Sequence, residues 1–191
     1  MDDDIEKIEF TIFDTETTGL DPSLGDRIVE LAAVRFKGRC NLSFFESFVN
    51  PGRPVSPEAF SVNKISAEML ISAPLPAEVI PKFMDFIRGS CLCSYNSGFD
   101  LGFLNNELRF LGLAAVKDIP IIDILKLARR TIPGLQSYAL WCVAKRLGIA
   151  IKQEHRALSD VRLAQEVFYS LKEMIARKNG SPLKLEKIVN I

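Results

Sequence analysis

The stretch FTIFDTETTGL, residues 10–20, begins as a core strand and ends in two acids. Side chains alternate between the two faces of a strand, so Phe10 and Ile12 share a face that Asp14 and Glu16 continue. A carboxylate left uncompensated inside a core is costly. Two interpretations follow: either the strand has left the sheet by Asp14 and DTETTG is a polar turn, or the acids are placed there for their chemistry.

The pattern around this stretch predicts the order of the elements. Prolines restrict residues 51–81 to short helices until a longer amphipathic one begins. The expected strands lie at 8–14, 27–37, 40–49, 91–95 and 119–122, and the expected helices at 77–88, 99–111, 123–130, 137–147 and 157–177. This order predicts an α/β arrangement with a mixed five-stranded sheet flanked by helices. The first three strands form a meander, and later strands alternate with helices.

The size and composition of the chain indicate an ordinary globular domain. Its 191 residues suffice for one substantial core, and 48% are hydrophobic and 25% charged. We expect a single domain over residues 1–177 and a C-terminal tail over 178–191, which loses periodicity and is either disordered or docks onto a partner. The acidic N-terminus and the lack of an apolar run near the ~18 residues that span a membrane predict a cytoplasmic protein.

The charges are unevenly distributed along a chain whose net charge is zero. Residues 1–100 hold 9 Lys or Arg against 16 Asp or Glu, whereas residues 101–191 hold 15 against 8. Such a chain is able to present a basic surface beside an acidic site. Scattered solvated charges would give the same counts, so both interpretations stay open.

Two later acids also point toward the expected core. Asp160 lies in the apolar stripe of the helix at 157–177, and Asp100 shares a helix face with Phe103 and Leu104. Each has an ordinary explanation, because an aspartate in a first turn is favoured by the helix dipole and is a common cap.

Taken together, the four acids indicate a metal site. Carboxylates converging from separate elements would repel one another unless cations neutralised them. Hard oxygen ligands select two Mg²⁺ or Mn²⁺ ions over zinc. The single histidine, His155, precedes Asp160 by five residues and is either a bland surface residue or a base at the rim of the cluster. An unperturbed pKa near ~6.5 suits it to take a proton from water.

Three segments of this chain resemble the motifs of the DEDDh 3′-to-5′ exonucleases, the DnaQ-like family that includes the proofreading epsilon subunit of bacterial DNA polymerase III and ribonuclease T. They are FDTETTG at 13–19, NSGFD at 96–100 and HRALSD at 155–160. The order and spacing of the three make the signal stronger than DTETTG alone. The resemblance implies a ribonuclease H-like fold.

The same resemblance implies the catalytic residues, which are Asp14, Glu16, Asp100, His155 and Asp160. Two divalent cations, Mg²⁺ or Mn²⁺, would be bound by the four acids: one by Asp14, Glu16 and Asp160, the other by Asp14 and Asp100. His155 would deprotonate the attacking water in a two-metal hydrolysis.

The resemblance also implies how a terminal nucleotide is held. Backbone NH groups of Thr17, Thr18 and Gly19 would reach the 3′ hydroxyl, and Leu20 would wedge against the last bases. Phe99 is a candidate stacking surface, with core packing as its alternative.

This chain departs from the family pattern at two places. Tyr95 stands before the motif Asn96 where many relatives have histidine, and Val62-Asn63-Lys64-Ile65 replaces a Val-His-Gly-Ile segment. Asn63, Lys64 and Asn96 are therefore candidate substrate contacts of this chain, with Lys64 available for a phosphate.

The function implied is a metal-dependent 3′-to-5′ exonuclease that releases nucleoside 5′-monophosphates from single-stranded or frayed DNA, in proofreading or repair. Its partners would be a nucleic-acid 3′ end and a DNA polymerase subunit. An RNA-trimming exoribonuclease is the alternative within the same chemistry. A catalytically silent interaction module and a ribonuclease H-like endonuclease that makes internal cuts are the alternatives from other classes.

Overall fold

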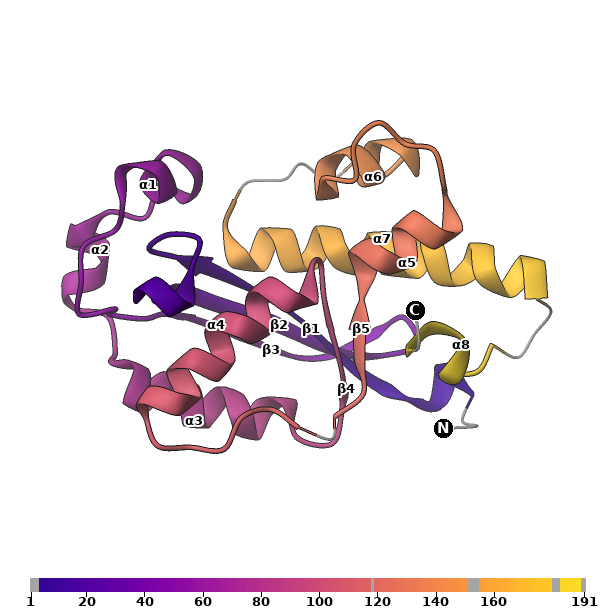
Figure 1. Ribbon diagram of the computed structural model, residues 1–191. Helices are drawn as coiled ribbons and strands as arrows, with labels where there is room; N and C mark the ends of the chain where they lie inside the picture. The colour runs from indigo at the N-terminus through magenta and orange to yellow at the C-terminus, as the bar shows by residue number, and fades with distance from the viewer. Residues whose placement is uncertain (1–3, 118, 151–154, 180–182, 190–191) are drawn as a thin grey trace.

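We describe the fold from a computed structural model, which covers residues 4–117, 119–150, 155–179 and 183–189. The strands are β1 (Glu9–Thr17), β2 (Ile28–Lys37), β3 (Cys40–Phe48), β4 (Cys91–Ser94) and β5 (Ile121–Asp123). The helices are η1 (Ile5–Lys7), η2 (Pro22–Leu24), α1 (Pro57–Asn63), α2 (Ala67–Ile71), α3 (Pro76–Ile87), α4 (Ser97–Phe110), α5 (Ile124–Thr131), α6 (Leu140–Arg146), α7 (Ala157–Asn179) and α8 (Glu186–Val189). Figure 1 shows their arrangement.

The five strands form one mixed sheet in the order β3-β2-β1-β4-β5. β1, β2 and β3 pair antiparallel as a meander, and β4 and β5 join parallel to β1 and to each other. The predicted mixed five-stranded sheet is confirmed. The parallel strands follow crossovers through helices, whereas a short turn at Gly38, with φ of 56°, joins the hairpin strands.

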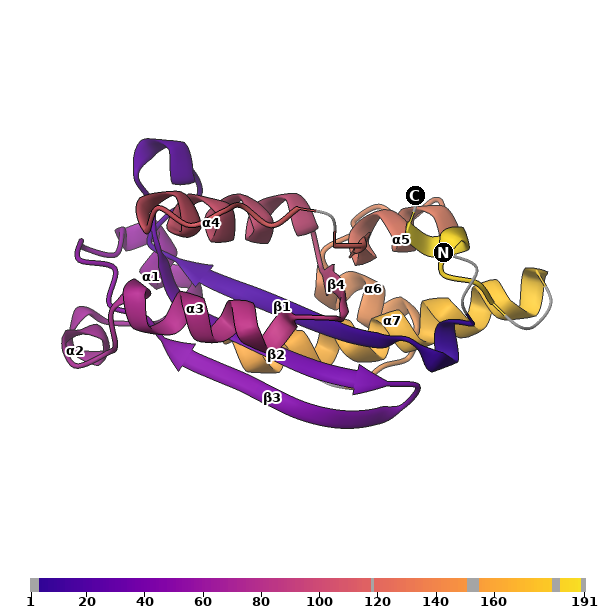
Figure 2. The ribbon, with the colours of Figure 1, turned by 90° about the horizontal axis from the view of Figure 1, so that it is seen from below.

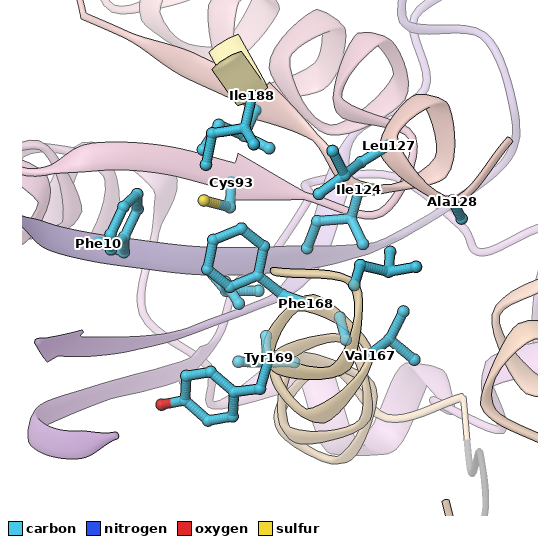
Figure 3. Packing of buried hydrophobic residues seen from close by; sticks show 14 of the residues in the cluster. Phe10, Cys93, Ile124, Leu127, Ala128, Val167, Phe168, Tyr169 and Ile188 are labelled. Carbon is cyan, nitrogen blue, oxygen red and sulfur yellow. The ribbon is translucent and has the colours of Figure 1, made fainter. Parts of the chain in front are cut away.

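Helices cover both faces of the sheet, as Figure 2 shows with α3 in front of it and α7 behind. Alternate residues of β1 serve the two layers. Phe10 faces α7, with its ring centroid 5.4 Å from that of Phe168, whereas Phe13 faces α3, 5.6 Å from Phe83. Figure 3 shows the α7 layer, in which Phe168 and Val167 pack toward Ile124 and Leu127 of α5.

β1 continues through the acids rather than ending before them. Asp14 pairs with Ala32 and Glu16 with Glu30 in the antiparallel register, so DTET is strand. The interpretation of DTETTG as a polar turn from Asp14 onward is therefore wrong. The acids keep the face of Phe10 and Ile12 and point to the side on which α7 lies.

The segment after α7 returns to the domain. The backbone NH of Ile5 donates to the carbonyl of Leu183 at 3.0 Å, and Asp4 forms a bridge with Lys184. Leu183, Leu185 and Ile188 are buried in the α7 layer. The described residues 183–189 thus pack on the domain where the sequence predicts a tail. The boundary at residue 177 stays a prediction.

Membrane-spanning candidates were sought among the helices of the described residues. None of these helices combines the length and the apolarity that crossing a membrane requires.

Candidate active site

Three of the predicted acids meet where β1 ends and α7 begins. Asp14 and Glu16 come from alternate positions of β1, and Asp160 from the first turn of α7. One carboxylate oxygen of each lies within 4.8 Å of the others. Asp14 and Glu16 are half-buried and Asp160 is buried. The spacing and the hard oxygen donors fit a divalent cation.

Asp100 lies beside this group and is held by the sheet. Its Oδ1 accepts hydrogen bonds from the backbone NH of Thr15 at 3.0 Å and from the hydroxyl of Thr15 at 2.7 Å, and its Oδ2 accepts one from the hydroxyl of Ser94. Both partners are buried strand residues next to the acids. The orientation of Asp100 is thereby fixed from β1 and β4.

The acids perturb one another strongly. Burial, reinforced by the charges of Asp160 and Glu30, raises the pKa of Glu16 to about 8. Burial and then the charge of Asp100 raise the pKa of Asp14 well above its usual range. Burial raises the pKa of Asp100 to about 6, although hydrogen bonds from Ser94 and Thr15 oppose the shift. Bound cations would lower the pKa of these carboxyl groups, because they stabilise the ionised form.

His155 stands at the rim of the acid group. Its backbone is left-handed, with φ of 52°, and its side chain is 49% exposed. Nδ1 lies 4.0 Å from Oδ2 of Asp160. The imidazole is thus within about one water of the cluster while remaining open to solvent, the arrangement that a general base requires.

A further acid, Glu30 of β2, belongs to the site and was not predicted. Its buried carboxylate accepts from Arg156, with Nη2–Oε1 at 2.8 Å, and from the backbone NH of Ala157 at 3.0 Å. Through these bonds Glu30 holds the start of α7 against the sheet, at a point between His155 and Asp160. The available signal was an acid inside the apolar run IVELAAV, whose partner the sequence does not identify.

A pocket of about 550 Å³ opens beside Glu16, and several predicted substrate contacts line it: Thr17, Gly19, Leu20, Asn63 and Phe99. Leu20 is 84% exposed at its rim. The ring of Phe99 also lies 4.9 Å from that of Phe103, so it both lines the pocket and packs. A side chain at Gly19 would collide with the carboxylate of Asp26, which explains the glycine.

Three of the predicted contacts are engaged in hydrogen bonds within the chain. Thr18 is buried and donates to Asp26 at 2.9 Å. Asn63 also fastens the end of β1, because its amide donates to the carbonyl of Thr17 at 3.3 Å. Lys64 Nζ donates to the carbonyl of Ser61 at 2.5 Å.

Asn96 has φ of 79° and lines a second cleft together with Asp14 and His155 rather than the first pocket. The substrate roles of Asn96 and of the other predicted contacts stay predictions.

Sequence comparison finds the same kind of domain in known proteins. The family model described as Exonuclease matches residues 11–168. The epsilon subunit of DNA polymerase III from Treponema pallidum is 34% identical over 177 residues, which cover 92% of this chain and 81% of that protein. The PolC-type DNA polymerase III of Caldanaerobacter subterraneus is 35% identical over 167 residues. The match covers 87% of this chain but 12% of that polymerase.

Comparison with solved structures also finds exonucleases. Exonuclease X in complex with 5′ overhanging duplex DNA superposes with a TM-score of 0.70 at 26% identity, covering 95% of this chain and 98% of that one. Escherichia coli Exonuclease I in complex with a dA16 oligonucleotide gives a TM-score of 0.80 at 20% identity over 90% of this chain and 42% of that one, which shows a shared fold. The predicted ribonuclease H-like α/β fold is confirmed.

Proposed function

Because this chain belongs to the exonuclease family, we propose that it removes nucleoside 5′-monophosphates from the 3′ ends of single-stranded or frayed DNA, in proofreading or repair. The observation that carries the proposal is the convergence of Asp14, Glu16 and Asp160 beside a pocket large enough for a nucleotide. All five catalytic positions of the family motif are present, which disfavours a silent interaction module.

The donor set fits two divalent cations, Mg²⁺ or Mn²⁺. Asp14, Glu16 and Asp160 would hold one, and Asp14 with Asp100 the other. When bound, such cations neutralise charge that develops on the phosphoryl oxygens and supply hydroxide at neutral pH.

The chain's own residues supply the rest of the proposed chemistry. His155, 4.0 Å from Asp160, would take the proton of the attacking water. The backbone NH of Thr18 already donates to the carbonyl of Arg27 at 2.9 Å, so the NH groups of Thr17 and Gly19 would orient the 3′ hydroxyl. Leu20 and Phe99 would enclose the terminal base in the apolar pocket. Asn63 would hold the wall of that pocket against Thr17.

Among the proposed contacts, Asn96 and Lys64 do not line the first pocket. Asn96 would reach the nucleotide from the second cleft, which it shares with Asp14. Lys64 must release Ser61 before it can contact a phosphate.

DNA is the proposed substrate because the relatives include DNA polymerase subunits and a solved neighbour holds DNA. Because the relatives include DNA polymerase subunits, we also propose a DNA polymerase subunit as the partner and the cytoplasm as the location. The whole chain of the PolC-type relative is far longer, so its polymerase activity is not carried over. RNA trimming is the alternative that substrate assays would distinguish.

A digestion series tests the proposal. Labelled single-stranded, frayed and blunt DNA and matched RNA are incubated with Mg²⁺, Mn²⁺ or a chelator. We expect mononucleotides from DNA 3′ ends only when a cation is present. Asp14→Asn abolishes release, whereas the matched change Asp85→Asn on exposed α3 preserves it. Internal fragments, or release in chelator, would overturn the proposal, and digestion of RNA alone would assign the RNA substrate.

The same assay tests the base. His155→Ala lowers turnover by about 100-fold or more, because no other described residue at that rim carries an imidazole. Calorimetry with Mn²⁺ is expected to give an affinity close to that of the unmodified chain, since His155 acts on water. An equal loss of cation affinity would contradict this role.

A further inference from the structure

A second cleft, of about 580 Å³, opens on the other side of the acid group. Figure 1 shows the N-terminal end of α7 lying between α1, which borders the first pocket, and α6, which borders the second. We call the second cleft the α6 cleft. Its lining includes Asp14, Tyr95, Arg129, Tyr138, Trp141, His155 and Asp160. It shares three catalytic residues with the site, so it continues directly from the place where a phosphodiester would be cleaved.

The far wall of the α6 cleft is aromatic and braced. The hydroxyl of Tyr95 donates to the carbonyl of Tyr138 at 2.5 Å. The hydroxyl of Tyr138 donates in turn to the carbonyl of Ile132 at 2.9 Å. The position that departs from the family histidine thus holds the segment that begins α6.

Beside this wall, the side chain of Trp141 is 54% exposed. An open indole face next to a reactive site suits a stacked base, whichever base it is.

One cation, Arg129, lines the same wall, and the segment around it carries four more. Residues 124–150 contain Lys126, Arg129, Arg130, Lys145 and Arg146 and no Asp or Glu. Among the described residues none of the five forms an ion pair, and the guanidinium of Arg129 lies 5.0 Å above the ring of Tyr138, inside the cleft. A cation in the cleft beside the acid group gives a polyanion a path toward a centre that would otherwise repel it.

We propose that the α6 cleft binds the single-stranded DNA that precedes the scissile phosphate, with a base on Trp141 and a phosphate on Arg129. The inference rests on the proposed function. A phosphodiester joins two nucleotides, and the apolar pocket at Leu20 takes the terminal one. The preceding nucleotide needs a second surface next to the acid group, and the α6 cleft, which Asp14, His155 and Asp160 line, supplies one.

Two substrates separate this role from catalysis. The p-nitrophenyl ester of thymidine 5′-monophosphate places only its nitrophenyl leaving group beyond the scissile phosphate, whereas an oligothymidylate also places further bases and phosphates in the α6 cleft. We expect Trp141→Ala to lower kcat/KM for the oligonucleotide by about tenfold or more and to lower kcat/KM for the ester far less, because the ester carries no base or phosphate beyond its leaving group. Phe44→Ala, a matched change at an aromatic of 50% exposure on β3, is expected to alter neither.

Arg129 gives a second, independent readout. Arg129→Ala should reduce the slope of log affinity against log salt by about 0.7, the share of one phosphate on a single strand. Arg88→Ala, an exposed arginine at the end of α3, is the control and should leave the slope unchanged.

Direct binding is measurable because Trp141 is the only tryptophan of the chain. In the His155→Ala protein with Mg²⁺, oligothymidylate should quench its fluorescence and thymidine monophosphate should not, with saturation followed independently by the anisotropy of a labelled strand. Unchanged fluorescence at saturation, or equal losses on ester and oligonucleotide, would overturn the inference. Failure of the unmodified chain to cleave either substrate would instead count against the proposed function.

Discussion

At the scale of single residues, two glutamates face each other across β1 and β2, because Glu16 pairs with Glu30. Like charges at directly opposed positions repel. Arg156 compensates Glu30, whereas Glu16 points into the group with Asp14 and Asp160. Burial, and then the charges of Asp160 and Glu30, raise the pKa of Glu16 to about 8, so without cations Glu16 retains its proton at neutral pH.

This shift predicts how stability depends on pH in chelator. Unfolded glutamate has a pKa near ~4.3, so between there and about 8 the folded chain holds a proton that the unfolded chain has lost. Stability present at low pH is therefore lost as pH rises through that window. We expect the melting temperature in chelator to fall from mildly acidic to mildly basic pH and saturating Mg²⁺ to restore it at the basic end.

Glu16→Gln should flatten that dependence, whereas Glu58→Gln, at an exposed position, should preserve it. Differential scanning calorimetry across the pH range checks both variants. A melting temperature in chelator that does not change with pH would contradict the raised pKa.

At the scale of elements, the start of α7 is joined to β2 by an ion pair whose acid is buried and whose arginine is part exposed. Glu30 is 1% exposed and Arg156, at 42%, also lies over the ring of Phe48 at 5.2 Å. His155 precedes Arg156 directly, and Asp160 follows it by four residues. The ion pair therefore fixes the position of the helix whose first turn contains Asp160.

Removing the cation should leave a buried carboxylate uncompensated. Arg156→Met is expected to lower the free energy of unfolding by about 2 kcal/mol, less than for a fully buried pair because Arg156 is part exposed. Arg162→Met, one turn or more along α7 and over the ring of Phe44, is the control and should cost about 0.5 kcal/mol or less. Urea denaturation measures both, and equal values would contradict the assignment.

Sequence periodicity predicted these elements well where the pattern is local. Alternation placed Asp14 and Glu16 on the core face, and the stripe of α7 placed Asp160 toward the sheet, as observed. The bond from Thr15 to Asp100 and the pair of Glu30 with Arg156 span 85 and 126 residues. No periodicity encodes such partners, because they depend on which strands become neighbours. The same holds for Tyr95, whose partner lies on the segment before α6.

At the scale of the whole molecule, the described segment 183–189 closes the α7 layer of the core. Ile188 is 1% exposed and, as Figure 3 shows, lies on the same side of the sheet as Ile124 and Leu127. The sequence suggests a tail there because the run between α7 and α8 has no helical period. Three separate apolar side chains nevertheless suffice to anchor it.

Ile188→Ala should therefore lower the free energy of unfolding by about 2–4 kcal/mol. Nucleotide release, measured well below the melting temperature, should be unchanged, because this part of the core lies away from the acid group. Lys187→Ala, at the exposed neighbour, is the control. If both variants unfold at the same urea concentration, the segment does not stabilise the core.

The bridge between Asp4 and Lys184 also brings the first and last described parts of the chain side by side. Figure 1 shows these parts beside α8 and well away from the N-terminal end of α7. A module whose ends adjoin can be inserted into a single loop of a host chain without a spanning linker. Such an insertion would keep the rim of the acid group away from the point where the two chains join.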